Sequence, residues 1–318
     1  MPYYFFTSLH LLLMRHLLSK WLSPAPETFQ EPEETMGQVE WFRCVPYIMV
    51  HALVLLAFLY PVTWPCLVVA LISYSLRMFG ITGFYHRYFS HRAFKTSRWV
   101  QFLGAALACS AGQRGPLWWA AHHRRHHRHS DTEKDVHSPN RKSFFWSHTL
   151  WFMTDYAYPT FLKEIRDWIK FPELHFLNRY DWLPFLMLAG GCYGLGCLEW
   201  FQNLTGLTGM TMLIWGFLVP TIALYHATFA VNSITHLFGT RRYETRDSSR
   251  NNALIAFLTL GEGWHNNHHF FPGSARQGFF KGEIDLTYYG LKMLAWFGLV
   301  KELKPVPVWV RERGSERI

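Results

Sequence analysis

Charged side chains are absent from three stretches of the chain, and these stretches carry the first structural prediction. Residues 44–76 contain no Asp, Glu, Lys or Arg, and neither do residues 182–198 and 200–240. A helix needs about 20 apolar residues to cross the hydrocarbon core of a bilayer. Residues 44–76 suit one helical hairpin, and the other two stretches suit a second. The pattern therefore predicts four membrane-spanning helices.

The second helix has to continue beyond residue 76 to reach the required length. It then includes Arg77, whose long side chain we expect to extend to the membrane interface. Helices buried inside a large soluble protein are the alternative interpretation. That alternative leaves residues 200–240 unexplained, because so long a stretch without one charge is typical of a membrane span.

The charge distribution adds an orientation. The chain has 318 residues, only 17% of them charged, and 31 Lys and Arg against 22 Asp and Glu give a net charge of +9. The hairpin connections at 61–64 and 202–209 carry no Lys or Arg, unlike residues 77–179 and the chain from residue 241 onward. Cytoplasmic segments are enriched in Lys and Arg, so both termini and the long middle segment are expected on the cytoplasmic side. Basic residues there meet anionic lipid, and the absence of a recognition motif argues against nucleic acid.

The two ends of the chain differ from its apolar middle. Residues 1–23 place several Leu on one helical arc, which predicts a helix lying in the membrane interface, followed by an acidic linker at 27–34. The expected organisation is an interfacial helix and linker at 1–43, a membrane and catalytic domain at 44–290, and a cytoplasmic tail at 291–318. The fold class is an all-α integral membrane protein with a cytoplasmic helical cap.

Half of the 18 histidines have spacings that suit metal ligation. His86 and His91 are five positions apart, where the second span leaves the membrane. A regular α-helix would place them about 140° apart, so the pair favours a helix end that bends around a metal. Two boxes, HRRHH at 123–127 and HNNHH at 265–269, repeat the offsets 0, +3 and +4, which bring three imidazoles into one helical arc of about 100°.

Together these positions supply more imidazoles than one metal ion can bind, so we predict a two-metal site held by the cap. His236, at the cytoplasmic end of the fourth span, completes the set, and Asn232, four residues earlier, could hold a water molecule against one metal. The nine expected ligands are His86, His91, His123, His126, His127, His236, His265, His268 and His269.

Residues near the boxes have candidate supporting roles. Asp131, Asp135 and Glu262 could accept the second N–H of a ligating imidazole, and plain surface ion pairs are an equally open interpretation. Other histidines are expected to be packed, hydrogen-bonded, solvated or in contact with the ligands. They are His51, His122, His129, His137 and His226.

Imidazole binds Zn, Cu, Fe and Ni alike, so the ligands alone do not choose the metal. The location narrows the chemistry, because a long apolar chain can arrive from the lipid where the hairpins leave the bilayer. With an O2-activating iron pair, the natural reaction is oxidation of an unactivated C–H bond in that chain. A histidine-rich metal transporter is the alternative from another class, but it would need polar ligands along a path through the spans.

Four motifs resemble those of the membrane fatty acid desaturases of the stearoyl-CoA Δ9 type, particularly their bacterial branch. The motifs are HRYFSH at 86–91, HRRHH at 123–127, VNSITH at 231–236 and GEGWHNNHHFFPGSARQG at 261–278, in the family's order and spacing. The resemblance implies a diiron centre bound by the nine histidines and, through water, by Asn232. It also implies a bent acyl tunnel in which O2 and two electrons yield a cis double bond, and a location in a bacterial inner membrane.

The resemblance also suggests substrate contacts. Phe229 stands where animal relatives have a Trp beside the tunnel, Trp118 and Trp119 belong to a stretch shared with bacterial relatives, and Arg141 and Lys142 could meet phosphates. An Arg-Asp pair that contacts the CoA headgroup in the animal enzymes is replaced here by Ala121 and His122, and a basic pair on their cap is replaced by Asp155 and Tyr156. Acyl-CoA is the favoured substrate, and chains bound to phospholipid or to a carrier protein stay open.

The electron source is expected to be a separate protein. The sequence shows no His-Pro-Gly-Gly haem motif and no cysteine cluster suited to iron and sulfur. A ferredoxin, a rubredoxin-like protein or a flavin-dependent reductase would each serve. A hydroxylase with the same histidine boxes is the rival activity, because oxygen rebound and a second hydrogen abstraction differ only by small shifts in substrate position.

Overall fold

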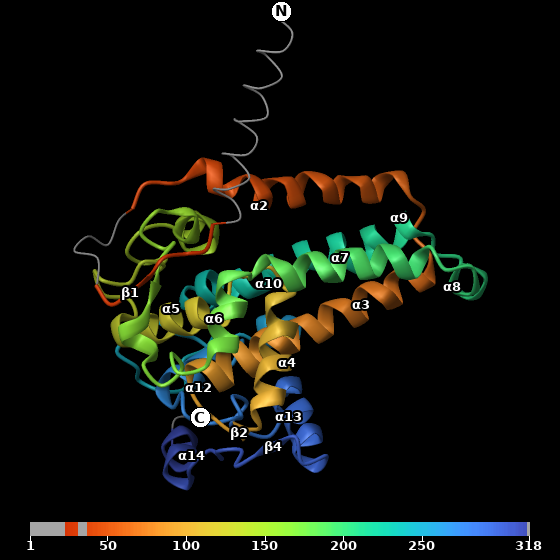
Figure 1. Cartoon of the computed structure of the whole chain (residues 1–318). Coiled ribbons are helices and arrows are strands. Elements are labelled where there is room, and N and C mark those ends of the chain that lie inside the picture. Colours follow the sequence, from red (N-terminus) through yellow and green to blue (C-terminus); the bar gives the residue numbers. More distant parts are fainter. Residues whose placement is uncertain (1–22, 31–36, 317–318) are drawn as a thin grey trace, which may run out of the picture.

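The computed structural model describes residues 23–30 and 37–316 and is built almost entirely of helices (Figure 1). Its long apolar helices extend toward the end of the molecule where α8 (Glu199–Thr205) and α9 (Gly209–Met212) lie, and the shorter elements gather at the opposite end (Figure 1). The interfacial helix expected for residues 1–23 lies outside the described residues, apart from Ser23.

Within the described residues, three helices are long and apolar enough to cross a membrane. The first is α2 (Trp41–Leu53) with η1 (Val54–Leu59), and the second is α3 (Trp64–Phe79) with η2 (Gly80–Ser90). The last joins α9 (Gly209–Met212), η6 (Leu213–Leu218), α10 (Val219–Ser233) and η7 (Ile234–His236). Between them, α7 (Trp182–Gly196) and α8 (Glu199–Thr205) meet at a bend of 79° and count as a fourth span only if taken together. A helical membrane protein is therefore supported, and the four-span topology stays a prediction.

Arg77 lies inside the second span, as expected, but its side chain does not extend to the interface. It is 1% exposed, and its guanidinium donates to Thr221 Oγ1 at 2.7 Å and to the Phe217 carbonyl at 3.4 Å, both in the last span. A buried charge is costly without such partners. The expectation of an interfacial Arg77 is wrong because a neighbouring helix supplies acceptors that the local sequence does not reveal.

Short elements form the cap, and two small sheets tie distant segments of it together. Its helices are α4 (Arg98–Cys109), α5 (Pro116–His129), η3 (Trp146–Leu150), η4 (Trp151–Met153), η5 (Leu162–Ile165), α6 (Pro172–Arg179), α11 (Ala253–Leu258), α12 (His265–Phe270), α13 (Leu286–Trp296) and α14 (Val308–Ser315). Strand β1 (Glu27–Thr28) pairs in parallel with β3 (Thr160–Phe161), and β2 (Lys95–Thr96) pairs antiparallel with β4 (Val300–Lys301). Helix α13 is continuous across position 290, where the tail was expected to begin.

The largest buried core lies where the second span enters the cap. Aromatic side chains of η2 form its centre: Tyr88 stacks on Phe94 with ring centres 5.0 Å apart, and Phe89 packs against Trp168 at 5.2 Å. Large aromatic groups packed in this way rigidify the surrounding backbone. The same helix carries His86 and leads directly into His91, so the core fixes both side chains.

Candidate metal centre

The nine expected ligands gather into two groups. Within each group, one nitrogen of every histidine lies within 4.8 Å of the others. The first group is His86, His91, His123, His127 and His268, and the second is His126, His236, His265 and His269. Each HxxHH box therefore contributes histidines to both groups, and neither group comes from a single motif.

A π-helical turn brings His86 and His91 together. Residues 80–90 form the π-helix η2, and the His91 amide donates to the His86 carbonyl at 3.2 Å. In a π-helix residue i pairs with residue i+5, so a five-residue spacing returns to the same face. Their ring centres lie 4.9 Å apart. The spacing of five, which disagrees with an α-helix, is the sequence signal of this turn.

The two boxes lie on α5 and α12, and each helix turns its histidines toward both groups. On α5, His123 and His127 are one α-turn apart and belong to the first group, whereas His126 belongs to the second. On α12, His265 and His269 belong to the second group and His268 to the first. Offsets of 0, +3 and +4 thus present one helix edge to two adjacent sites.

The contacts between ring nitrogens require a positive charge in the first group. His268 Nε2 lies 3.0 Å from His86 Nε2 and 2.9 Å from His127 Nε2. A neutral ring nitrogen carries either one proton or one lone pair. Because His86 Nδ1 faces the Glu262 carboxylate, its Nε2 is a lone pair, and hydrogen bonds cannot satisfy all three nitrogens at once. A cation among them satisfies all three.

In the second group, too, hydrogen bonds do not satisfy all the ring nitrogens that face one another. His236 Nε2 faces His265 Nε2 at 3.1 Å, and among the described residues the buried Nε2 atoms of His126 and His269 have no hydrogen-bond partner. Nitrogen ligands held about 2.0–2.1 Å from one transition-metal ion lie about 3 Å apart. Both groups therefore fit a metal ion, and neutral nitrogen donors suit iron as well as zinc or copper.

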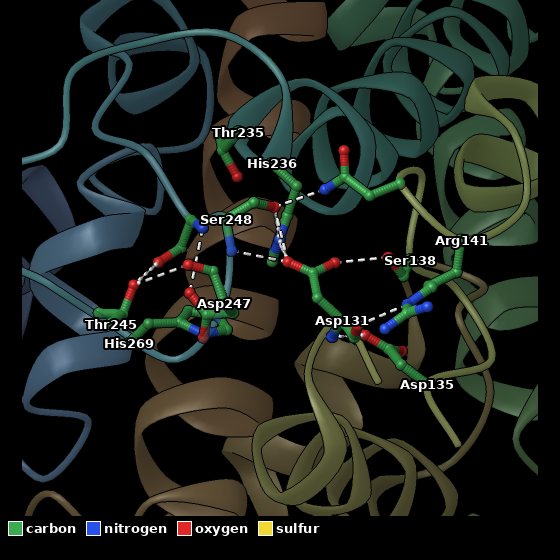
Figure 2. A network of polar contacts seen from close by, with 12 residues as sticks. Asp131, Asp135, Ser138, Arg141, Thr235, His236, Thr245, Asp247, Ser248 and His269 are labelled. Carbon is green, nitrogen blue, oxygen red and sulfur yellow. Dashed lines mark hydrogen bonds and ion pairs between the residues drawn. The ribbon is translucent and has the colours of Figure 1, made fainter. Parts of the chain in front are cut away.

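Carboxylates hold the opposite ring nitrogens (Figure 2). His236 Nδ1 lies 3.1 Å from Asp131 Oδ2, and His269 Nδ1 donates to Asp247 Oδ2 at 2.6 Å. Outside this view, His126 Nδ1 lies 3.2 Å from Asp135 Oδ2. With the Glu262 contact to His86, a carboxylate faces the outer nitrogen of four of the nine rings, and hydrogen bonds set the tautomers of His236 and His269. The positions of Asp131, Asp135 and Glu262 match the supporting role considered for them. Asp247 was missed, because nothing in its local sequence marks it.

These surroundings keep the rings neutral and the acids ionised. Burial, followed by the neighbouring histidines, lowers the pKa of five rings well below the usual 6.5, namely His91, His123, His127, His265 and His268. Burial raises the pKa of Asp131 and Asp247, but the hydrogen bonds from His236 and His269 outweigh it and hold both pKa values well below the usual range. Neutral imidazole is the form that binds a metal.

A buried polar network supports the first group from the side of the C-terminal segment. Arg87 donates to Glu262 at 2.9 Å and to Asp285 at 3.0 Å. The Gln277 side-chain amide donates to Glu262 at 2.8 Å and lies 3.2 Å from His86 Nδ1. The sequence patterns predicted no role for Arg87 or Gln277. Their places in the first and the last motif are the sequence features that could have indicated one.

A cavity of about 460 Å³ leads to the histidines. Its lining includes the substrate candidates Phe229, Trp118 and Trp119 together with Asn232, and it reaches His86 and His123 of the first group and His265 of the second. Within its lining, Gln113 Nε2 donates to Thr228 Oγ1 at 2.6 Å. The other two candidates lie elsewhere: Arg141 Nε donates to the Asp131 carbonyl at 3.0 Å, and Lys142 lies over the Trp146 ring.

Four of the described histidines outside the ligand set have fixed partners. His137 is buried and pairs with Asp135 at 3.1 Å, so one carboxylate contacts both His137 and the ligand candidate His126. His122 is also buried, with Nε2 3.0 Å from the Pro159 carbonyl. His51 and His226 hydrogen-bond to each other, as expected. None of these four joins the two groups of ligand candidates, but His137 forms a third group with Asp135 and His126 whose ligand atoms lie within 4.8 Å of one another.

Comparison with known proteins decides the family. The family model for fatty acid desaturases matches residues 62–279, which is more than half of the chain. The chain belongs to the fatty acid desaturase family. This desaturase is 37% identical to an sn-1 stearoyl-lipid 9-desaturase of Anabaena variabilis over 85% of its own length and 96% of the relative's.

Other relatives of the desaturase differ in the carrier of the chain. It is 36% identical to the Delta-9 acyl-lipid desaturase 1 of Arabidopsis thaliana over 86% of both chains. It is also 36% identical to an acyl-CoA 5-desaturase of Anemone leveillei over 79% of its length and 75% of the relative's. Fatty acid desaturation, and hence oxidoreductase chemistry in lipid metabolism, is thereby supported. The histidine groups are consistent with the iron site of such an enzyme.

Proposed function

We propose that this desaturase uses O2 to insert a cis double bond at Δ9 of a saturated acyl chain. The observation that carries the proposal is the cavity, whose aromatic wall at Phe229 and Trp119 continues to histidines of both groups. An acyl chain in this space would lie beside both metal sites. The reaction removes two hydrogens from adjacent methylenes, and with O2, two electrons and two protons it yields one double bond and two waters.

Two iron ions bound by the nine histidines, with Asn232 acting through water, would supply the activation of O2. The chain's own groups have separate tasks. Glu262, Asp131, Asp135 and Asp247 keep the outer ring nitrogens protonated and thereby aim the lone pairs at the cations. The aromatic lining excludes water from the chain, and the hydrogen bond between Gln113 and Thr228 joins two segments of the cavity wall.

We favour a lipid-bound acyl chain over the acyl-CoA that the sequence alone favours. Two relatives are named as enzymes of acyl-lipids. Residues at the two pairs that differ from the animal enzymes are also committed to internal contacts here, since Asp155 Oδ1 accepts from the Tyr156 amide at 2.7 Å and His122 bonds to the Pro159 carbonyl. Acyl-CoA is the alternative, and a relative with that substrate is known.

The setting of the enzyme is part of the same proposal. We place four spans in a bacterial inner membrane, with both termini and the histidine boxes on the cytoplasmic side, and residues 1–43 begin with an interfacial helix. Residues 44–290 carry membrane and catalytic functions, and residues 291–318 form the cytoplasmic C-terminal part. Electrons come from a separate ferredoxin, rubredoxin-like protein or flavin-dependent reductase.

Expression in a host that lacks unsaturated fatty acids tests the proposal. Total fatty acids are analysed by gas chromatography with mass spectrometry after derivatisation of double bonds, with a matched electron donor co-expressed. A cis-Δ9 monoene made by the unmodified protein and not by His269→Ala supports both the reaction and the metal site. Hydroxylated chains would identify the hydroxylase instead. No product in the presence of the donor would overturn the proposal.

A further inference from the structure

Two apolar helices form facing walls of the cavity. Helix α2 contributes Tyr47 and Val50, and α7 contributes Phe185 and Leu186. Both helices belong to segments apolar enough to lie in a membrane. In Figure 1, α2 runs roughly parallel to α7 and stands apart from the remaining long helices.

The exposed lining residues locate the opening of this cavity. Glu40, Arg43 and Pro46, at the start of the first span, are exposed, and Leu186 on α7 is 53% exposed. A residue that lines a cavity and is also exposed marks its mouth. Since Pro46 and Leu186 lie within the apolar segments, the mouth extends along the sides of the helices and faces the bilayer.

Charged and polar groups surround the end of the mouth near the cap. The Arg43 guanidinium lies 3.5 Å from the centre of the Tyr158 ring, and that of Arg114 lies 4.5 Å from it. Both arginines line the cavity, together with Glu40 and Asp181. This end suits a polar headgroup at the interface, while Val50 and Leu186 suit the hydrocarbon of its chains.

A row of histidines holds α2 against α10. His51 Nε2 lies 3.2 Å from His226 Nε2, and His226 Nδ1 lies 3.1 Å from His148 Nε2. His51 Nδ1 donates to the Tyr47 carbonyl at 2.9 Å, and His148 Nδ1 lies 2.9 Å from Ser233 Oγ. One assignment of protons satisfies every nitrogen with neutral rings, unlike the metal centre. The row is therefore complete without a metal.

Two histidines of the row lie inside apolar helices, where burying polar side chains costs free energy. Polar side chains within membrane helices are expensive and mark function, and both His51 and His226 lie inside apolar segments. Tyr47, one turn before His51, packs against Tyr225 and Phe152 with ring centres 5.6 Å away in each case. These contacts hold α2 at a set distance from α10 and so determine how far it stands from α7.

We propose that the mouth between α2 and α7 is a lateral portal through which an acyl chain enters from the bilayer while still attached to its glycerolipid. This inference rests on the proposed function. A glycerolipid with two chains cannot approach from the cytoplasm without exposing both chains to water. A mouth that faces the bilayer admits one chain, leaves the second among the lipids and keeps the headgroup at the interface. An acyl-CoA, with one chain and a soluble carrier, needs no such side opening.

Photo-crosslinking in vesicles tests the portal without requiring catalysis. The full-length protein is reconstituted into phosphatidylcholine vesicles that contain a phosphatidylcholine with a diazirine on its saturated sn-1 chain, and labelled peptides are identified after illumination. We expect label on the inner lining at Trp119 or Phe229 in the unmodified protein. Leu186→Trp should reduce that label at least tenfold. Met187→Trp is the matched control, because Met187 is 66% exposed and is not among the described lining residues.

Equal inner labelling of Leu186→Trp and the unmodified protein would overturn the portal, and so would label confined to outward-facing residues. A bulky group attached to the folded protein keeps the test valid if the Trp variant misfolds. Leu186→Cys is introduced together with Cys197→Ser, because the other cysteines are buried, and a bulky maleimide is attached after folding. The modified protein should lose inner labelling that the unmodified sample of the same variant retains.

Turnover separates this inference from the proposed function. Turnover of stearoyl-phosphatidylcholine and of stearoyl-CoA in vesicles is measured for the unmodified protein and the same variants, with a chemical reductant as the electron source. We expect Leu186→Trp to slow turnover of the lipid at least tenfold while Met187→Trp does not. If the unmodified protein desaturates neither substrate, the proposed function fails while the labelling result stands. Equal turnover of the lipid by both variants overturns the portal alone.

Discussion

The His91 backbone amide bonds to the His86 carbonyl across one π turn, at 3.2 Å. This single hydrogen bond explains why a histidine spacing that no α-helix can use places two rings in the same group of predicted ligands. The turn is built into a core of aromatic side chains that includes Phe89, so its geometry does not depend on a metal.

Moving the second histidine by one position tests the π turn. In the double variant Ser90→His/His91→Ala the histidine moves to position 90, where the side chain is directed back along η2, because Ser90 Oγ donates to the Tyr85 carbonyl. We expect the metal ion of the first group to be lost while that of the second group stays, measured as iron per chain by mass spectrometry.

The control for this test is Ser90→Ala. It removes only the hydrogen bond from Ser90 Oγ to the Tyr85 carbonyl at 2.9 Å, which contributes about 1 kcal/mol. This variant should keep its full metal content. Full metal content in the double variant would show that His91 is not a ligand.

Asp247→Asn tests the carboxylate that the sequence did not reveal. Asp247 accepts the Nδ1 proton of His269 at 2.6 Å, and an amide holds that ring more weakly. Loss of such a partner lowers metal affinity about 10–100-fold. Competition with a chelator measures the change, and Glu133→Gln, an exposed acid near Asp131, is the control and should leave affinity unaltered. Equal affinities in the two variants would exclude this role for Asp247.

The stability of the metal-free protein should fall as the solution is acidified below pH 6.5. Burial, and then neighbouring histidines, lowers the pKa of rings such as His123 and His127 below 6.5 in the folded state. Between those values and 6.5 the unfolded chain binds protons that the folded chain does not, so the free energy of unfolding decreases with falling pH. We expect a drop in Tm of about 5 °C or more between pH 7.5 and 5.5, measured with a chelator present. An unchanged Tm would mean that the rings are not held neutral.

Thr228→Val removes a hydrogen bond between two residues of the cavity wall. Gln113 Nε2 donates to Thr228 Oγ1 at 2.6 Å, and without an acceptor the walls are free to shift at a cost of about 1–3 kcal/mol for the unpaired amide. We expect slower turnover and double bonds at more than one position, detected by gas chromatography with mass spectrometry. Thr211→Val, in the same apolar segment, should give the normal product. A single product from Thr228→Val would exclude a positioning role for this bond.

Local patterns predicted much of the fold and the inventory of the site. Apolar stretches without charge located the long helices, and offsets of three and four located α5 and α12, because both patterns depend only on helix geometry and on the cost of burying charge. Arg77 shows where such reasoning ends. Its acceptors on Thr221 and Phe217 lie 144 and 140 positions later in the chain.

The sequence by itself determined which imidazoles are available, since the spacing of His123, His126 and His127 is a property of one helix. Only the tertiary structure decided which of them act together. It joined His268 to His86 and His127, gave His269 the carboxylate of Asp247, and set α2 against α10 through His51 and His226. The physical reason is that a metal group, a buried ion pair or an interhelical bond forms between segments far apart in the chain, and their distance depends on how all the helices pack.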